Sequence, residues 1–174
     1  MDVFASAIVA RAQLPTGHDI QSASEDNLPA VIALLADDVL GAAREVSDRA
    51  ARQRYEAAFA AISIDPNHAV AVLTRASCAV GTCQLSFLPG LAFEGSWRAQ
   101  IESVRIAKSE RGNGLGRCLM RWAVAAASAK GCRIVQLTTN VERPDARAFY
   151  ARLGFQPTHT GFKLMVGEGR KAPQ

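Results

Sequence analysis

The chain has 174 residues and a mass of 18.6 kDa, within the usual range of one domain. Hydrophobic residues make up 49%, charged residues 21% and aromatic residues 6%, which excludes a disordered or fibrous protein and indicates an aliphatic core. The formal charge of +4 favours an anionic ligand, but acidic and basic residues are interspersed, which argues against a nucleic-acid-binding block.

The cysteines and histidines predict no metal site. The four cysteines form no Cys-x-x-Cys pair and the three histidines are scattered, so we expect free thiols and no zinc. No apolar run approaches the ~20 residues of a membrane span. Asp2 stands where an export signal carries positive charge. We therefore expect a cytoplasmic protein that contacts no membrane.

Turn residues and apolar spacing divide the first half into alternating elements. Capping side chains at 24–27 precede apolar residues at helical intervals, and Asp65-Pro66-Asn67 ends a second such pattern. The elements expected are an arm (1–17), a strand (18–23), two helices (28–35 and 44–61) and three strands (69–74, 81–88 and 99–107).

The second half alternates more regularly. Leu115, Leu119, Trp122 and Ala126 share one helical face, which is closed by Lys130-Gly131. The later elements expected are a strand (134–139), a helix (144–153), closing strands (from Phe155, and 162–166) and a tail (167–174). Residues 18–166 are thus expected to form one domain.

The segment Arg111-Gly112-Asn113-Gly114-Leu115-Gly116-Arg117 lies between an apolar strand and an amphipathic helix. Glycines allow close approach of the backbone to a ligand, and the free N–H groups at a helix N-terminus favour phosphate oxygens. The Walker pattern fails because no Lys-Ser or Lys-Thr follows, and the dinucleotide fingerprint fails at Arg117. We therefore expect a pyrophosphate here; the alternative is a turn that only joins strand to helix.

This segment resembles the cofactor signature of the GNAT superfamily, which is Gln or Arg, two free positions, Gly, one free position, then Gly or Ala. Arg111, Gly114 and Gly116 match it, and the resemblance extends over residues 81–164. It implies an α+β GNAT fold, with a mixed, mostly antiparallel sheet of six to seven strands, splayed central strands and about four flanking helices. The activity implied is transfer of an acetyl group from acetyl-CoA to an amine.

The resemblance also implies how the cofactor is held. The main chain around Arg105, at Val104 and Ile106, would bond the pantetheine arm where strands 102–106 and 134–139 splay apart. The pyrophosphate would bind the N–H groups of residues Arg111, Gly112, Asn113, Gly114, Leu115, Gly116 and Arg117. Many members carry an Asn where this chain has Arg143, so Asn140 is only a shifted substitute. Phe149 is expected beside the cofactor.

Two residues are the expected catalytic groups. Tyr150 aligns with the family tyrosine that protonates the departing thiolate; the alternative is a core aromatic on the stripe with Phe149. Several members use a glutamate as general base at the position of Glu102, which strand alternation places on the face of Val104 and Ile106. The alternatives for Glu102 are an ion pair with Arg98 or Arg105, or orientation of a substrate ammonium.

The predicted function is direct acetyl transfer from acetyl-CoA to the amine of a small molecule or a protein, without a metal or an acyl-enzyme. Asp37 and Asp38 either attract that amine or form a solvated helix end. The rival function is a non-catalytic acyl-CoA-binding module that regulates a partner. A basic nucleic-acid binder is a poorer fit, because the chain has no reading motif and few aromatics. A homodimer is left open.

Overall fold

The computed structural model describes residues 14–37, 48–164 and 166. The chain divides into two compact units, residues 1–137 and residues 138–174. The expected arm up to residue 13, positions 44–47 of the expected second helix, Asp38 and the tail 167–174 lie outside the described residues.

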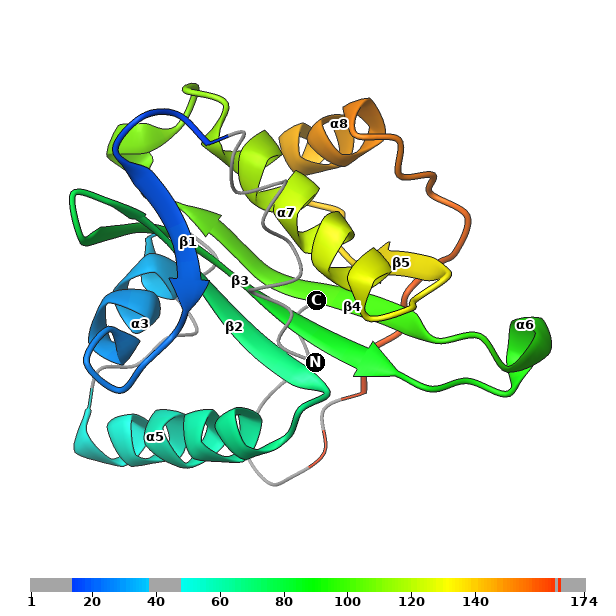
Figure 1. The fold of residues 1–174 in the computed structure, drawn as a ribbon, viewed down its shortest axis with the longest axis horizontal. Helices are drawn as coiled ribbons and strands as arrows, with labels where there is room; N and C mark the ends of the chain where they lie inside the picture. Colours follow the sequence, from blue (N-terminus) through cyan, green and yellow to red (C-terminus); the bar gives the residue numbers. More distant parts are fainter. Residues whose placement is uncertain (1–13, 38–47, 165, 167–174) are drawn as a thin grey trace. The chain divides into compact units, whose positions relative to one another are not determined.

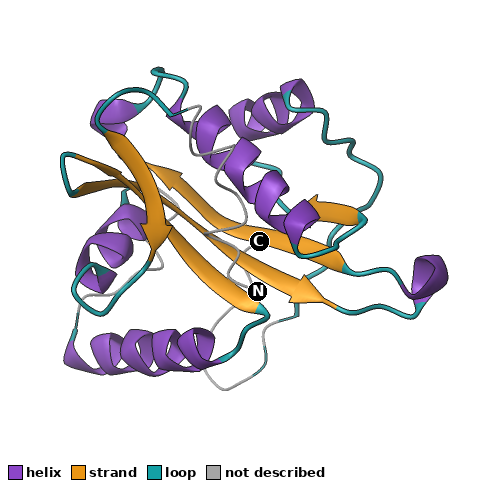
Figure 2. Cartoon of the chain, viewed as in Figure 1, coloured by secondary structure: helices purple, strands orange, loops and turns teal. Residues whose placement is uncertain are grey.

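A five-stranded sheet forms the centre of the first unit (Figure 1, Figure 2). Its strands lie in sequence order: β1 (His18–Ser22), β2 (His68–Arg75), β3 (Cys78–Leu88), β4 (Arg98–Ile106) and β5 (Ile134–Leu137). The first three pairings are antiparallel, and β4 pairs with β5 in parallel. The expectation of a mixed, mostly antiparallel sheet is confirmed.

Helices connect and cover these strands (Figure 2). They are α3 (Leu28–Ala36), α5 (Arg49–Ile64), the short α6 (Ala92–Gly95), the 3₁₀ turn η1 (Lys108–Glu110) and α7 (Leu115–Ala129). The Asp48 carboxylate caps α5 by accepting a hydrogen bond of 2.6 Å from the N–H of Ala51. No helix in the described part of the chain is both long and apolar enough to cross a membrane.

The core lies on both faces of the central strands. Ala71, Val72 and Leu73 are consecutive in β2 and all fully buried, although alternate residues of a strand point to opposite faces. Both α3 and α7 pack on β3 and β4. Trp122 on α7 is fully buried, and the Lys130 ammonium lies over the Phe87 ring, which marks the face covered by α7.

The second unit contains α8 (Pro144–Arg152). Pro144 stands in its first turn, as expected from its fixed φ, and the described residues after Phe155 form no helix or strand. The expected closing strands are therefore not found. The side chains of Phe162 and Leu164 are 94% and 86% exposed, so no packing supports a strand there.

The sheet thus has five strands among the described residues, and the expected six to seven are not confirmed. Five α-helices are present there, against the four expected. The extra helix, α6, lies in the excursion between β3 and β4, and its residues Phe93 and Glu94 have left-handed backbone angles that its sequence does not signal.

Candidate active site

The glycine segment forms the predicted junction between η1 and α7. Gly112 and Gly114 have φ values of +87° and +77°, a region that favours glycine, and α7 begins at Leu115. Among the described residues, no group accepts a hydrogen bond from the backbone N–H groups of residues 112–116. A Cβ added at Gly112 or Gly114 would meet nothing within 4 Å. The open backbone and the helix N-terminus together fit a phosphate ligand.

The remaining signature side chains are arranged around this backbone. Leu115 is buried and anchors the first turn of α7, whereas Asn113 and Arg117 are exposed. Gly116 is partly exposed. Of residues 111–117, only Leu115 is buried in the core, so the rest of the loop is accessible to a ligand.

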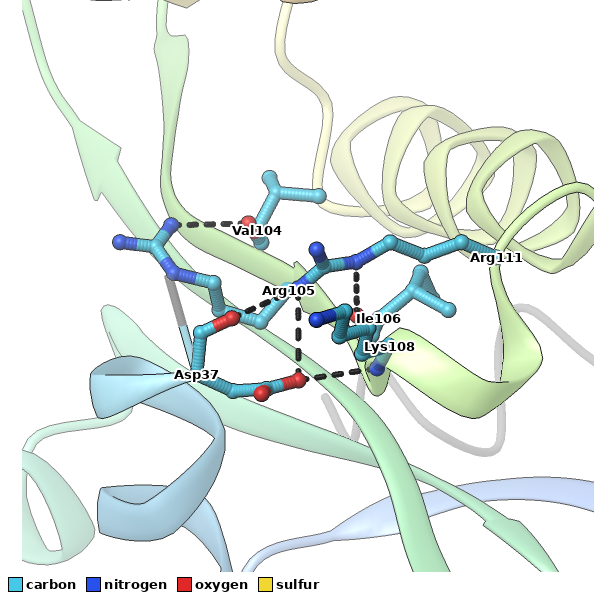
Figure 3. A network of polar contacts seen from close by, with 6 residues as sticks. All are labelled: Asp37, Val104, Arg105, Ile106, Lys108 and Arg111. Atoms are coloured by element: carbon cyan, nitrogen blue, oxygen red, sulfur yellow. Dashed lines mark hydrogen bonds and ion pairs between the residues drawn. The ribbon is translucent and has the colours of Figure 1, made fainter. Parts of the chain in front are cut away.

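Arg111, the first signature residue, ties the loop to α3 (Figure 3). Its Nε donates to the Ile106 carbonyl (2.9 Å), and its Nη2 donates to the Asp37 carbonyl (2.8 Å) and lies 3.3 Å from the Asp37 carboxylate. The same carboxylate accepts from the N–H of Lys108 at 2.8 Å. Asp37 therefore holds the end of β4 and the start of the loop together.

Beyond Ile101, β4 has a free edge on the side away from β3. β5 pairs only with Arg98–Ile101, so among the described residues no strand pairs with residues 102–106 on that side. Ala107 donates to the Val80 carbonyl of β3, and successive residues of a strand bond to opposite sides, so Ile106 and Val104 direct their backbone groups to the free edge. Two described residues of the first unit, Arg111 and Arg105, donate to these carbonyls.

All four residues of β5 pair with Arg98–Ile101, and β5 ends at Leu137, before the expected residue 139; the splay of the two strands stays a prediction. The main-chain groups of Val104 and Ile106 lie on the strand that leads directly into the glycine loop. A ligand with an extended arm and a pyrophosphate could therefore lie along the edge and end at the loop.

A β-bulge interrupts β4 between the two halves of this strand. Thr82 pairs with Arg105 and Gln84 with Glu102, so Ser103 and Val104 both lie opposite Cys83. Ser103 has a φ of +55°. Strict alternation is broken here.

The expectation that the Glu102 side chain shares a face of the sheet with Val104 and Ile106 is therefore wrong. The extra residue of the bulge places Glu102 on the face of Arg105, Thr82 and Gln84, opposite to the face of Ile101 and Ile106. Glu102 is exposed, and its side-chain carboxylate makes no hydrogen bond or ion pair with another described residue. The alternative of an ion pair between Glu102 and Arg98 or Arg105 is not found in the described chain.

In the second unit, Tyr150 and Phe149 lie on α8 and are partly exposed. The Tyr150 ring makes edge contacts with Phe149 (centroids 5.2 Å apart) and Phe155 (6.1 Å). Asn140 is exposed, and its side-chain oxygen accepts from the N–H of Glu142 at 3.0 Å. The predicted aromatic stripe is present, but α8 buries none of its residues completely.

The buried cysteine of β3, Cys83, is not a nucleophile. Burial raises the pKa of the Cys83 thiol to about 12, so this thiol stays protonated and unreactive near neutral pH. No group of three or more metal-binding side chains occurs among the described residues.

We expect Gly114→Val to weaken binding of acetyl-CoA by roughly tenfold or more, because a branched residue is strained at this φ and fills the space a phosphate would take. Calorimetry on the folded variant measures this. Gly131→Val is the matched control, since Gly131 has a φ of +86° and equal open space but follows the C-terminal end of α7. Equal affinity of the Gly114 variant and the wild type would remove the loop from the cofactor site.

Comparison with known proteins agrees with this geometry. The sequence pattern of the Acetyltransferase (GNAT) family matches residues 17–155. The chain is 31% identical over 110 residues to an aminoalkylphosphonate N-acetyltransferase of Salmonella typhimurium, covering 63% of this chain and 71% of the relative.

Solved structures share the fold. One, described as a transcriptional regulator from Bacillus halodurans, is 41% identical with a TM-score of 0.82 and covers 86% of this chain and 99% of its own. AAC(6')-Iy, in complex with the bisubstrate analogue CoA-S-monomethyl-acetylneamine, is 18% identical with a TM-score of 0.69 and covers 86% and 98%. The match of the family pattern over most of the sequence establishes that the chain belongs to the GNAT family and is an N-acetyltransferase.

Proposed function

We propose that the protein transfers an acetyl group from acetyl-CoA directly to the primary amine of a small-molecule acceptor. The observation that carries the proposal is the free edge of β4 running into a glycine loop whose N–H groups have no acceptor among the described residues. The family uses acetyl-CoA, and AAC(6')-Iy was solved with a CoA-containing analogue. The Salmonella relative is named for a small-molecule amine.

Each part of the cofactor has residues of matching chemistry. The main chain of Val104 and Ile106 would bond the amide-rich pantetheine arm, and the N–H groups of residues 112–116 would hold the pyrophosphate. The N–H groups of Arg111 and Arg117, also expected there, already donate to the carbonyls of Lys108 and Gly114. Arg111 would act through its bonds to Ile106 and Asp37, which fix the loop, and not as a phosphate ligand. Asn140 and Phe149 are proposed as further contacts.

In the proposed reaction, Glu102 accepts a proton from the ammonium of the acceptor, either directly or through water. The neutral amine then attacks the thioester carbonyl, the attacking nitrogen gives its second proton to water, and the carbon–sulfur bond breaks. Tyr150 gives its proton to the departing thiolate, and solvent restores the hydroxyl. Glu102 can act as the general base because its carboxylate is exposed and has no ion-pair partner among the described residues, so it can accept a proton.

A screen of amine acceptors with acetyl-CoA, read by the release of free thiol, tests the proposal. Small amines, amino acids, aminoglycosides and lysine peptides are the classes to include. Transfer to at least one small amine, with kcat that rises with pH as the ammonium loses its proton, is the expected result. Binding of acetyl-CoA without transfer to any amine would contradict it.

That contradicting outcome would support a second candidate, an acyl-CoA-binding module that regulates a partner. The observation in its favour is the 41% identical structure described as a transcriptional regulator. Under this reading the glycine loop binds the ligand, while Glu102 and Tyr150 are structural. Unchanged acetyl-CoA affinity in variants of both residues, together with an absence of turnover in the wild type, would favour it.

A further inference from the structure

Two opposite charges on one face of β4 have no ion-pair partner in the part of the chain that the structure describes. Arg98, Gln100 and Glu102 are alternate residues before the bulge, so their side chains share a face. The Arg98 Nε is buried and has no hydrogen-bond partner, and neither Arg98 nor Glu102 makes an ion pair with a described residue. A buried guanidinium N–H without an acceptor is uncommon in native proteins and indicates a missing ligand or water.

The neighbouring polar groups on this face are already satisfied. Ser86, which pairs with Gln100 across β3 and β4, has its hydroxyl 2.9 Å from the His68 ring nitrogen. Gln100 accepts a hydrogen bond of 2.8 Å from the Gln136 amide of β5. Arg105, the third charged residue of β4 on this face, lies beyond the bulge and donates to the Val104 carbonyl. Arg98 and Glu102 are the two charged residues before the bulge, and among the described residues neither has an ion-pair partner.

The separation of the two charges limits the ligand. Four residues of a strand span roughly 13 Å between Cα atoms, and both side chains are long enough to lean along the strand and shorten the gap. The two charges do not neutralise each other in the described structure, since no ion pair joins them. A short molecule with a positive and a negative end would pair with both.

We infer that the acceptor is a zwitterionic amine, an ammonium joined by a short linker to a carboxylate, phosphonate or sulfonate. Its ammonium lies at Glu102, and its acid group receives hydrogen bonds from the Arg98 guanidinium, with Gln100 between them. Arg98 is then a specificity-determining residue. This inference rests on the proposed function, because it assigns the acceptor of the same site.

The test compares three acceptors of equal chain length: 2-aminoethylphosphonate, β-alanine and the neutral 2-aminoethanol. In the wild type, kcat/KM for the two acids should exceed that for 2-aminoethanol by roughly ten- to hundredfold, the value of one charge-assisted hydrogen bond. Arg98→Gln should reduce both acids to the level of 2-aminoethanol, through KM, and leave 2-aminoethanol unchanged. Arg98→Lys should keep part of the preference for the two acids over 2-aminoethanol, because the lysine ammonium keeps the positive charge but lacks the planar, bidentate guanidinium.

Arg121→Gln is the matched control, since Arg121 is an exposed arginine on α7. Equal kcat/KM for all three acceptors in the wild type, or an equal loss for all three in Arg98→Gln, would overturn the inference while leaving acetyl transfer intact.

Calorimetry of 2-aminoethylphosphonate with the CoA-loaded protein separates the inferred acceptor from the proposed acetyl transfer. Binding that depends on Arg98 without turnover would retain the inference and contradict the catalytic step, and an absence of binding would overturn the inference.

Discussion

Glu102→Gln is expected to lower the rate of the chemical step by roughly 10²–10⁴-fold, the usual contribution of a general base. Glutamine keeps the size and hydrogen-bonding capacity of the side chain but cannot take the proton of the acceptor ammonium. The loss should be largest at low pH, where the acceptor is protonated, and should shrink as pH rises and the free amine becomes available. The measurement is a pH profile of kcat/KM for both proteins with an identified acceptor, once chemistry is shown to limit the rate.

Glu94→Gln serves as control, because Glu94 is an exposed carboxylate in the excursion between β3 and β4, paired with Arg133 at 3.4 Å. Its profile should match the wild type. If the profiles of Glu102→Gln and wild type coincide along the ascending limb, Glu102 is not the base, and the proton goes to water or to another residue.

Tyr150→Phe is expected to reduce kcat by roughly 10²–10⁴-fold with little change in acetyl-CoA affinity, because it removes one proton donor and keeps the ring. The edge contacts of the ring with Phe149 and Phe155 do not involve the hydroxyl, so the local packing should persist. Single-turnover kinetics and calorimetry of acetyl-CoA measure the two quantities separately.

The chain has only one other tyrosine, Tyr55 on α5, and Tyr55→Phe is therefore the matched control. It should turn over like the wild type. A normal single-turnover rate in Tyr150→Phe would leave Tyr150 as an aromatic packing residue only. A lower affinity for acetyl-CoA at unchanged rate would assign the hydroxyl to cofactor binding.

The sequence predicted well those features that depend on local patterns. The stripe of Leu115, Leu119 and Trp122 defines α7 because helical spacing of apolar residues reports burial directly. The glycine loop is predictable for a similar reason, since Gly112 and Gly114 occupy backbone angles that few other residues adopt.

Features without a local signal were not predictable. The β2–β3 hairpin turns at Ala76 and Ser77, with φ values of +47° and +67°, although neither residue is a glycine or asparagine. The bulge at Ser103 likewise has no glycine to mark it, and one extra residue reverses the face of every side chain beyond it. Tertiary pairing sets both.

In the candidate site, too, the sequence predicts the features with a local signal and misses those set by tertiary contacts. The motif points to Arg111, but the partner of its guanidinium, Asp37, is 74 positions away in the sequence, and no local pattern links the two. From the sequence, Arg98 is considered only as an ion-pair partner of Glu102, just before the expected strand 99–107. Its buried Nε without a hydrogen-bond partner is visible only in the structure. Alternation along β4 would have grouped it with Glu102 from the start.

The bulge in β4 separates two stretches of one strand that have different proposed roles. In the proposal, side chains of residues 98–102 face the acceptor, whereas main-chain groups of residues 104–106 face the donor. Main-chain contacts persist through most side-chain substitutions, and the bulge absorbs small shifts between the two stretches. Substitutions at Arg98 or Gln100 would therefore change which acceptor binds and leave the donor the same.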